Sequence, residues 1–496
     1  MSRVFLWTLL GGALLMSTGC IVGPNYKRPS APAAPAFKEA PPPDFKEAEA
    51  QGWKLAQPGD AYMKGKWWEV YQDPALNALE EQVAISNQNV QQFEAQYRQA
   101  KAAVRVARAA LFPTVSTAPA ISFAQSGSAT SSVAGTGVAT GGTSAVRQLY
   151  NLPVDVSWEP DLWGAIRRGI ASAADTAVAA AADIENAKLL YQAELAQDYF
   201  QLHGADADID LLRRTEASYK EYLELTRNRF TAGIASDLDV AQAETQLYGA
   251  QTSLIDLGST RAQLEHAIAI LTGKAPVEVD VAEKPLATLP PPVPIGVPSL
   301  LLQRRPDIAA AERRVAAANE QIGIAIAAFY PNLTLSAGGG LENSSLAKWF
   351  TWPSRFWSVG PSLSETLFDA GRRAGVVAEQ RAAYDATVAT YRQTVLTALQ
   401  QVEDNLAALR VLEIESAKVD ETIQAATREL SVSTDQYKAG IQNYLTVILA
   451  QATLLAAERT KVDLLSRRLT SSVLLIEALG GGWDTSRLPD ARDVTR

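Results

Sequence analysis

The chain has 496 residues, of which 47% are hydrophobic and 20% are charged, and its formal net charge is −9. A mildly acidic chain without a basic run gives no reason to expect a nucleic-acid partner. Its one cysteine, Cys20, excludes an intrachain disulfide, and its two histidines, His203 and His266, are too few and too scattered for a zinc or di-iron site. We therefore expect no metal, no cofactor and no enzymatic activity.

Residues 1–19 have the pattern of a secretory signal peptide. Arg3 precedes an apolar run over residues 4–16, which is too short for a permanent membrane span but suits a signal sequence. Small residues stand directly before Cys20, as in a bacterial lipobox, so we predict that Cys20 carries diacylglycerol and becomes the mature N-terminus. Ile21, rather than an aspartate, follows it, which is typical of lipoproteins sent to the outer membrane. The alternative is an ordinary signal peptide with an incidental thiol.

The second half of the chain repeats the first. Residues 158–273 align without a gap on residues 365–480, which places Gly233 on Gly440. Register kept over this length indicates a duplicated unit, so both halves must contribute to function. The predicted organisation, in chain order, is a signal peptide (1–19), a lipidated strap rich in proline, alanine and charge (20–60), a first repeat (61–280), a Pro-rich linker (281–298), a second repeat (299–483) and a C-terminal tail (484–496).

Each half is predicted to run helix, strand, loop, strand, long helix, turn, helix. The predicted helices are 73–111, 164–229, 238–272, 305–329, 371–436 and 443–479, and the predicted strands are 114–125, 150–160, 332–340 and 356–368. In the second strand Val154, Val156 and Trp158 alternate with polar residues, a pattern typical of a tilted membrane strand. A half-buried strand of a soluble sheet is the alternative. The lack of any later apolar stretch of about 20 residues favours membrane strands over a helical span.

The two longest helices are predicted to reach roughly 100 Å, since each runs for about 65 residues without proline. The second shows a heptad stripe made of Tyr384, Val388, Tyr391, Val395, Ala398, Val402, Asn405, Leu409 and Leu412. A sustained period of about 3.5 residues predicts coiled-coil packing.

Four strands cannot close a barrel, for which about eight is the practical minimum. Open strand edges are not tolerated in lipid, where each unpaired N–H or C=O group costs several kcal/mol. Chains must therefore pool their strands: two would give eight strands and a filled barrel, and three would give twelve strands with room for a lumen. The helices would extend this tube, which predicts a passive conduit.

Several segments together resemble a known family. They are residues 20–26, Trp67 and Trp68, residues 159–164, 229–234, 301–308, 329–332, 368–371, 436–441 and 478–483. The Arg-Arg-Pro-Asp-Ile sequence within 301–308 is especially specific. On these residues the chain resembles the TolC-like outer-membrane efflux family, and specifically its OprM-like, or NodT-type, lipoprotein branch.

The resemblance implies an α+β membrane protein. Three identical chains would form a twelve-stranded β-barrel in the bacterial outer membrane, with four strands from each chain, continuous with a long α-helical coiled-coil barrel in the periplasm. It also implies docking on a periplasmic adaptor and on an inner-membrane transporter of the resistance-nodulation-division (RND) class, with outer-membrane lipid around the barrel. The function would be the export of small toxic compounds or drugs.

The two helix–turn–helix tips would be the gate and the adaptor contact. Gly233 and Gly440 supply the backbone freedom for each reversal, and Asp237 and Asn443 suit the N-caps of the returning helices. By analogy with the family, the gate residues would be Arg229, Asp237, Asp239, Tyr437, Gln442 and Asn443. Gln442 departs from relatives that have an acidic residue there, which puts an anionic ring at the second tip in doubt.

Two other functions stay open on the sequence alone. A channel for type I protein secretion has the same architecture, although the lipobox and the 301–308 segment favour the pump-linked branch. A periplasmic coiled-coil scaffold lipoprotein would explain the helices but not the strands.

Overall fold

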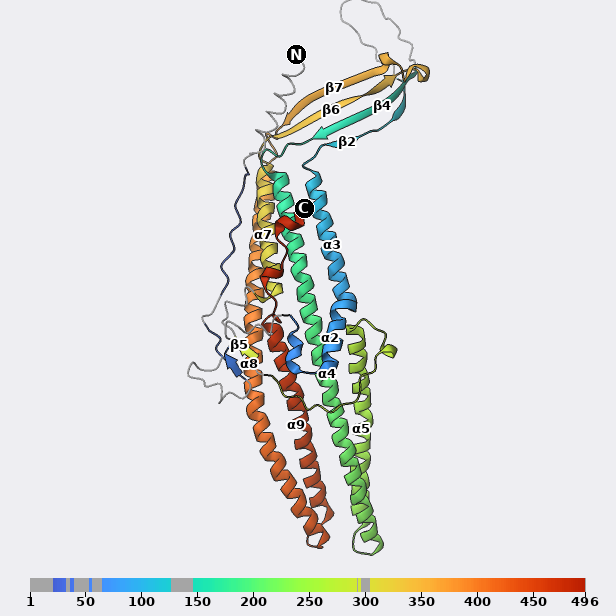
Figure 1. The fold of residues 1–496 in the computed structure, drawn as a ribbon, viewed down its shortest axis with the longest axis vertical. Coiled ribbons are helices and arrows are strands. Elements are labelled where there is room, and N and C mark those ends of the chain that lie inside the picture. Colours follow the sequence, from blue (N-terminus) through green and yellow to red (C-terminus); the bar gives the residue numbers. More distant parts are fainter. Residues whose placement is uncertain are drawn as a thin grey trace, which may run out of the picture.

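The computed structural model describes residues 21–32, 36–39, 53–55, 65–125, 146–291, 293–295 and 304–495. They form an elongated body with a curved sheet at one end and the turns of two helical hairpins at the other (Figure 1). The predicted signal peptide, Cys20, parts of the strap and linker, and the loop between the first two strands lie outside the described residues. Within the described part, no helix combines the length and apolar character that crossing a membrane requires.

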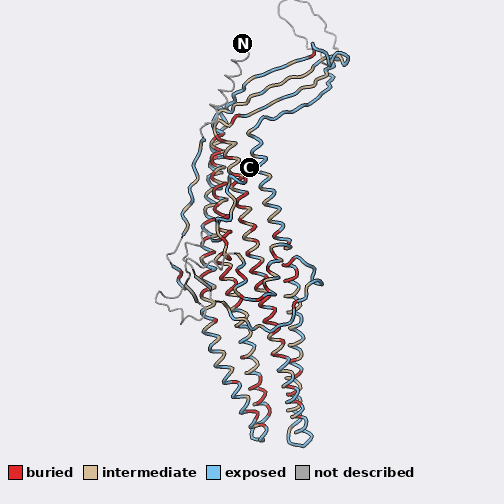
Figure 2. Tube along the Cα trace, in the orientation of Figure 1, coloured by how far each residue is buried: buried red, intermediate tan, exposed pale blue. Residues whose placement is uncertain are grey.

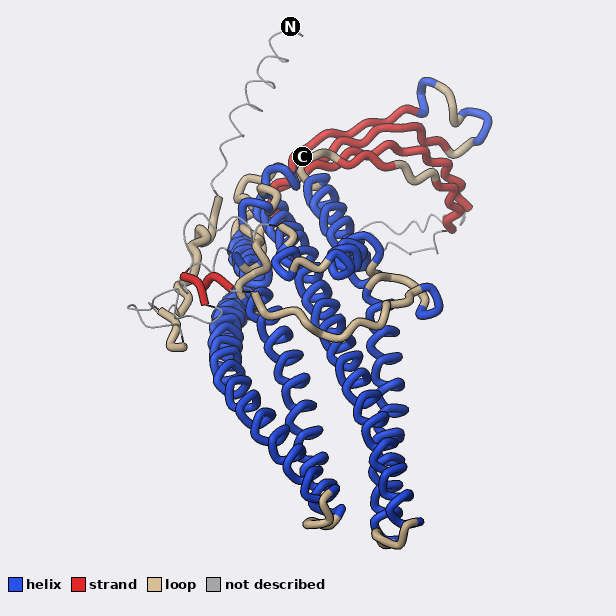
Figure 3. Tube along the Cα trace, turned by 60° about the horizontal axis from the view of Figure 1, so that its bottom comes forward, coloured by secondary structure: helices blue, strands red, loops and turns tan. Residues whose placement is uncertain are grey.

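Two helical hairpins of equal dimensions build most of the body. The first joins α4 (Ala165–Thr231) to α5 (Asp237–Leu271), and the second joins α8 (Arg372–Lys438) to α9 (Tyr444–Ala478). In each hairpin the outgoing helix has 67 residues and the returning helix has 35, as expected for a duplicated unit. Figure 3 shows them as two separate helix pairs below the sheet. A shorter helix, α7 (Pro306–Ala327), packs between α4 and α8.

Several of the described elements are short: β1 (Trp53–Leu55), β5 (Val293–Ile295), α10 (Ala491–Thr495) and the 3-10 helices η4 (Trp67–Tyr71), η5 (Pro276–Glu278), η7 (Leu346–Lys348), η8 (Trp352–Ser354) and η9 (Thr485–Arg487). β1 and β5 pair in parallel, so the strap and the linker meet beside the helices.

The predicted helix 73–111 is wrong in one respect, because it is divided into α2 (Pro74–Ser86) and α3 (Gln88–Ala109). Asn87 separates them with an extended ψ of 122°. Its Oδ1 accepts two backbone N–H groups from the first turn of α3, at 2.9 and 3.2 Å, and its Nδ2 donates to the Leu271 carbonyl at 2.8 Å. Asn87 thus caps α3 and ties the break to the end of α5.

The sheet is antiparallel and contains, among the described residues, β2 (Thr114–Ser116), β3 (Ala120–Gln125), β4 (Val146–Trp158), β6 (Asn332–Asn343) and β7 (Arg355–Ser364). β2 and β3 both pair with β4, β4 pairs with β6, and β6 pairs with β7. The sheet therefore ends in two edges, one at β2 and β3 and the other at β7.

Prolines account for two corrections to the predicted strands. Strand 114–125 is interrupted between β2 and β3, where Pro119 has no N–H to donate to the ladder. Strand 150–160 ends at Trp158, two residues before Pro160, which likewise has no N–H to donate; at its other end it begins earlier than predicted, at Val146.

The other two strands differ from prediction at their ends. Strand 332–340 continues to Asn343, and strand 356–368 ends at Ser364. Ser364 lies opposite Asn332, the first residue of β6, so no partner strand remains beyond that point.

The largest buried cluster lies at mid-height, where both hairpins, α2, α7 and η4 meet (Figure 2). The predicted stripe on α8 is confirmed at Tyr391, Val395, Ala398, Val402 and Leu412, which are buried. The predicted place of Asn405 in this stripe is wrong, because Leu406 is the fully buried residue there. A helix of 3.6 residues per turn brings the residue four positions after Val402 to the buried face.

An acid–arginine pair joins the two helices of each hairpin at matching positions of the duplication. Asp206 of α4 binds Arg261 of α5 at 2.8 Å, and Glu413 of α8 binds Arg468 of α9. In the first hairpin the linker after α5 adds to this pair, since the Lys284 backbone N–H donates to Asp206 at 3.0 Å. Burial alone would raise the pKa of Asp206, but hydrogen bonds from its neighbours lower it below its ordinary value. The linker is thereby attached to the first hairpin at mid-height.

Candidate functional site

The sheet has one apolar face and one polar face. Directly paired residues share a face, and successive residues in a strand point to opposite faces. One row across the sheet is Val115, Val156, Ala337 and Val359, and the next row is Ser116, Asp155, Gly338 and Ser358. The alternation predicted from Val154, Val156 and Trp158 is thus continued over every strand of the described sheet.

The apolar face is exposed rather than packed on the helices. Val115, Val154, Val359 and Leu363 are each about half exposed or more, and Trp357 is 81% exposed. Figures 1 and 3 show the sheet extending away from the bundle, with no helix covering either face. An exposed apolar face of this extent requires an apolar environment or a partner.

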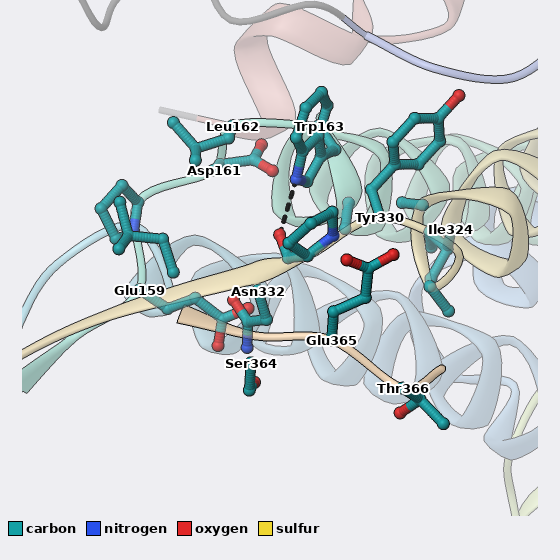
Figure 4. A pocket seen from close by; sticks show the side chains of 16 residues that line it. Glu159, Asp161, Leu162, Trp163, Ile324, Tyr330, Asn332, Ser364, Glu365 and Thr366 are labelled. Carbon is teal, nitrogen blue, oxygen red and sulfur yellow. Dashed lines mark hydrogen bonds between the residues drawn. The ribbon is translucent and has the colours of Figure 1, made fainter. Parts of the chain in front are cut away.

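A cavity of about 340 Å³ lies where the sheet meets the helices. Trp163 and Tyr330 stack beside it with their ring centroids 4.7 Å apart, and the Trp163 Nε1–H donates to the Pro331 carbonyl at 2.8 Å (Figure 4). Glu365 also lines this cavity. Trp163 precedes α4 in the first repeat and Tyr330 follows α7 in the second repeat, so the stack joins the two halves.

The described strap begins at this same junction. The Val22 backbone N–H donates to the Trp163 carbonyl at 3.1 Å, and the Arg168 Nε–H donates to the Val22 carbonyl at 2.7 Å. Further along, the Tyr26 hydroxyl donates to Glu312 Oε1 at 2.5 Å. Cys20 lies outside the described residues. The chain that follows it is bound beside the inner end of the sheet, which is the end that meets the helices.

The two tip turns use the predicted glycines. Gly233 and Gly440 have φ values of +74° and +76°, which only glycine adopts without strain. Asn443 caps α9 as predicted, since its side chain accepts the Thr446 N–H at 3.3 Å.

The N-cap predicted at Asp237 is wrong, because Ser236 has that role. Its Oγ accepts the Asp239 N–H at 3.2 Å, and Asp239 Oδ2 accepts the Ser236 N–H at 2.9 Å. This is a capping box, in which each residue satisfies the backbone N–H of the other. Asp237 is the exposed first residue of α5, and Asp239 is used in the cap.

Arg229 and Tyr437 connect the two hairpins at the tips. The Arg229 guanidinium lies 4.6 Å from the centroid of the Tyr437 ring, and its Nη1–H donates to the Lys438 carbonyl at 3.3 Å. Tyr437 is buried, and its ring lies 5.3 Å from that of Tyr444. The Tyr222 hydroxyl lies 3.0 Å from the Thr434 hydroxyl, one helical turn further from the tip. The structure thus brings together two of the predicted gate residues. Gln442 is exposed on the second turn, away from this contact.

Several carboxyl groups have raised pKa values, among them Glu477 and Asp198. Burial, opposed by Arg305 and increased by the negative charges of Asp307 and Glu194, raises the pKa of Glu477 to about 7. Burial and Glu194 raise the pKa of Asp198 to about 6. In the described part of the chain, no group of three or more His, Cys, Asp or Glu side chains could hold a metal ion.

Sequence reasoning missed the contacts that cross between segments. Arg168, Ser236 and Tyr222 were not singled out, because their partners lie on other helices or depend on the exact cap position. Trp163 and Tyr330 belong to the segments that carry the family resemblance, and that was the one signal available for them.

Comparison with known proteins gives a consistent result. The profile of the family described as "Outer membrane efflux protein" matches residues 79–274 and 297–481. The toluene efflux pump outer membrane protein TtgC of Pseudomonas putida is 31% identical over 94% of this chain and 93% of its own length. The pyoverdine export outer membrane protein OpmQ of Pseudomonas aeruginosa is 31% identical over 91% of this chain and 95% of its own length.

Solved structures show the same architecture. The outer-membrane channel OprN superposes with a TM-score of 0.82 at 29% identity, covering 94% of this chain and all of that one. The outer membrane protein VceC of Vibrio cholerae superposes with a TM-score of 0.76 at 27% identity, covering 84% of this chain and 99% of that one. These likenesses extend over both repeats.

Proposed function

The chain belongs to the outer membrane efflux protein family, and on this premise we propose that three copies form the exit duct of a tripartite pump. The protein is an outer-membrane efflux channel whose helices lie in the periplasm. Its α+β fold is that of the family.

The observation that carries the proposal is a two-faced sheet with two unpaired edges. In lipid, each open edge would leave backbone groups without partners at several kcal/mol per group. If the β7 edge of one chain pairs with the β2 and β3 edge of the next, three chains close a ring and no edge remains. β2 and β3 are two parts of the segment 114–125 and both pair with β4, so together they count as one strand of the ring. Each chain then gives four strands, and the ring has twelve. Twelve strands leave a lumen, whereas eight would be filled by side chains.

The two faces of the sheet assign the inside and the outside of the barrel. The apolar row with Val156 and Val359 faces lipid, and the row with Asp155 and Ser358 faces the lumen. Small polar side chains and glycines on the inner face leave space for a solute to pass.

The duct closes at the hairpin tips. The bridge from Arg229 to Tyr437 and Lys438 joins α4 to the end of α8, so the hairpins cannot separate until it breaks. Asp237, Gln442 and the capped turns at Gly233 and Gly440 are exposed beyond this bridge, where an adaptor protein can reach them. Asp239 and Asn443 hold the turns in shape through their caps rather than by closing the pore.

The partners are a periplasmic adaptor and an inner-membrane RND transporter, and the cargo is small toxic organic compounds. This follows the relatives, whose names assign toluene, solvents and antibiotics to their pumps. Cys20 anchors the chain by acylation. The strap bound at Trp163 places residue 21 beside the inner end of the sheet, which is where acyl chains on the preceding residue would enter the inner leaflet.

The test is deletion of the gene followed by a compound-susceptibility screen. We expect sensitivity to several organic solvents and antibiotics, restored by the full-length gene. A mutant with unchanged susceptibility to these compounds and a defect in secreting one protein would contradict efflux and favour type I secretion.

A further inference from the structure

The turn between β6 and β7 is a folded platform. The Lys348 carbonyl accepts hydrogen bonds from the Thr351 hydroxyl at 2.6 Å and the Ser354 hydroxyl at 2.7 Å. The Asn343 Nδ2–H donates to Ser354 Oγ at 2.7 Å, and Ser354 is buried. Trp349 fixes the platform to the sheet, because its Nε1–H donates to the Leu341 carbonyl at 3.1 Å.

This platform holds large apolar side chains out of the protein. Phe350 is 70% exposed, Trp352 is 74% exposed and Trp357, at the start of β7, is 81% exposed. The turn, with its defined hydrogen-bond network, and the start of β7 together display three exposed aromatic rings, which is the character of a binding surface. Aromatic side chains of this kind occur where a membrane meets water, since their rings are apolar and the indole N–H is polar.

The same segment carries two cations. The Arg355 guanidinium lies 3.4 Å from the centroid of the Trp352 ring, and Lys348 is exposed on η7. Among the described residues neither cation has a carboxylate partner. Arg355 lies directly opposite Leu341, on the apolar face, so the adjacent Glu342 points to the other face of the sheet. The surface made of Lys348, Phe350, Trp352, Arg355 and Trp357 is called the outer-loop surface below.

The outer-loop surface lies at the end of the sheet furthest from the helices (Figure 3). Because the helices of this family lie in the periplasm, that end faces the outer leaflet. This step rests on the proposed function. A ligand for the surface must therefore combine an anionic group for the two cations with apolar chains or flat sugar rings for the aromatic side chains.

We propose that the outer-loop surface binds the phosphorylated headgroup of an outer-leaflet glycolipid of the lipid A class. Arg355 and Lys348 bind a phosphate, with Arg355 held in position by its stack on Trp352. Trp352 and Phe350 lie against the sugar and the upper acyl chains, and Trp357 continues this contact down the apolar face. The glycolipid therefore contacts each chain at a defined position instead of surrounding the barrel uniformly.

The test measures lipid retention by native mass spectrometry of the full-length protein released from detergent. The probes are bisphosphorylated lipid A, the same lipid without phosphates, and phosphatidylglycerol. The variant is the double substitution Lys348→Gln and Arg355→Gln. The matched control is Lys101→Gln with Arg105→Gln, which removes the same charge from exposed positions on α3.

We expect wild type and control to retain bisphosphorylated lipid A, and the double variant to bind it at least about tenfold more weakly. We expect dephosphorylated lipid A and phosphatidylglycerol to bind wild type at least about tenfold more weakly than the phosphorylated glycolipid. Equal retention by the double variant and wild type would overturn the assignment of these cations. Phosphatidylglycerol bound as tightly as lipid A would overturn the assignment of a glycolipid.

Single-channel conductance of the same double variant separates this proposal from the proposed function. Unchanged conductance with lost lipid A retention supports the glycolipid surface and shows that the barrel is intact. A wild-type protein that forms no channel would instead contradict the proposed function.

Discussion

Removing the Arg229 guanidinium should shift the tips towards the open state. In Arg229→Ala the stack on Tyr437, at 4.6 Å, and the hydrogen bond to the Lys438 carbonyl, at 3.3 Å, are both lost. A cation–π contact at a partly exposed site contributes about 0.5–1 kcal/mol, and a long hydrogen bond about 0.5–1 kcal/mol. Each chain therefore loses about 1–2 kcal/mol of closed-state stability. With about 1.4 kcal/mol for each tenfold change, the closed-to-open ratio of a trimer falls by roughly a hundredfold or more.

The assay is single-channel recording in a planar lipid bilayer, with two controls. Arg227→Ala removes the same charge two residues earlier, but Arg227 binds Glu244 of the same hairpin at 2.6 Å and does not join the hairpins. Tyr437→Phe keeps the aromatic ring and loses only a 3.5 Å contact with the Thr226 hydroxyl. We expect Arg229→Ala to stay open longer, with both controls close to wild type. If Arg229→Ala matches wild type, or if Arg227→Ala opens the channel equally, the bridge does not hold the tips closed.

Three further predictions concern the rest of the molecule. Asn87→Ala removes the cap of α3 and leaves the buried Leu271 carbonyl without its donor, so thermal unfolding should show a loss of about 1–3 kcal/mol; an unchanged melting temperature would contradict this. The pKa of Glu477 is raised to about 7, so the folded state binds its proton more tightly than the unfolded state, and stability falls as pH rises from about 4.5 to 7. Glu477→Gln should then be more stable than wild type by roughly 2–3 kcal/mol at pH 7.5 and equal to it near pH 4, and parallel pH–stability curves would refute the shift. Cys20→Ala should leave trimers assembled but poorly anchored, and a variant still labelled by radioactive palmitate would exclude acylation at that position.

The fold was predictable wherever it follows from periodicity and duplication. The alternation around Val156 and the long proline-free stretches after Gly164 and Gly371 are properties of one segment at a time. The turns at Gly233 and Gly440 are also local, since a positive φ is a requirement of the glycine itself.

The errors arise where a second segment decides the outcome. Asn87 interrupts a helical pattern because its side chain finds the Leu271 carbonyl, which is 184 residues away in the sequence. Leu406 replaces Asn405 in the core because the helix period, and not the ideal heptad, sets which side chain faces inward. Ser236 rather than Asp237 caps α5, since one residue of phase determines which side chain reaches the N3 amide.

The candidate gate was only partly predictable. Arg229 and Tyr437 came from the family resemblance, and the contact between them required the structure. The outer-loop surface around Trp352 was visible in the sequence only as a loop rich in tryptophan. The strand register was needed to show that Arg355 lies on the apolar face and Glu342 on the other face, so that Glu342 does not pair with Arg355.

The central claim is that three chains close one barrel by pairing the β7 edge of each with the β2 and β3 edge of the next. Mass photometry or light scattering of the detergent-purified protein, corrected for bound detergent, measures this most directly. The account predicts a particle of three chains with a clear β-sheet contribution in circular dichroism. A monodisperse single chain of about the sequence mass, 53.2 kDa, would contradict it.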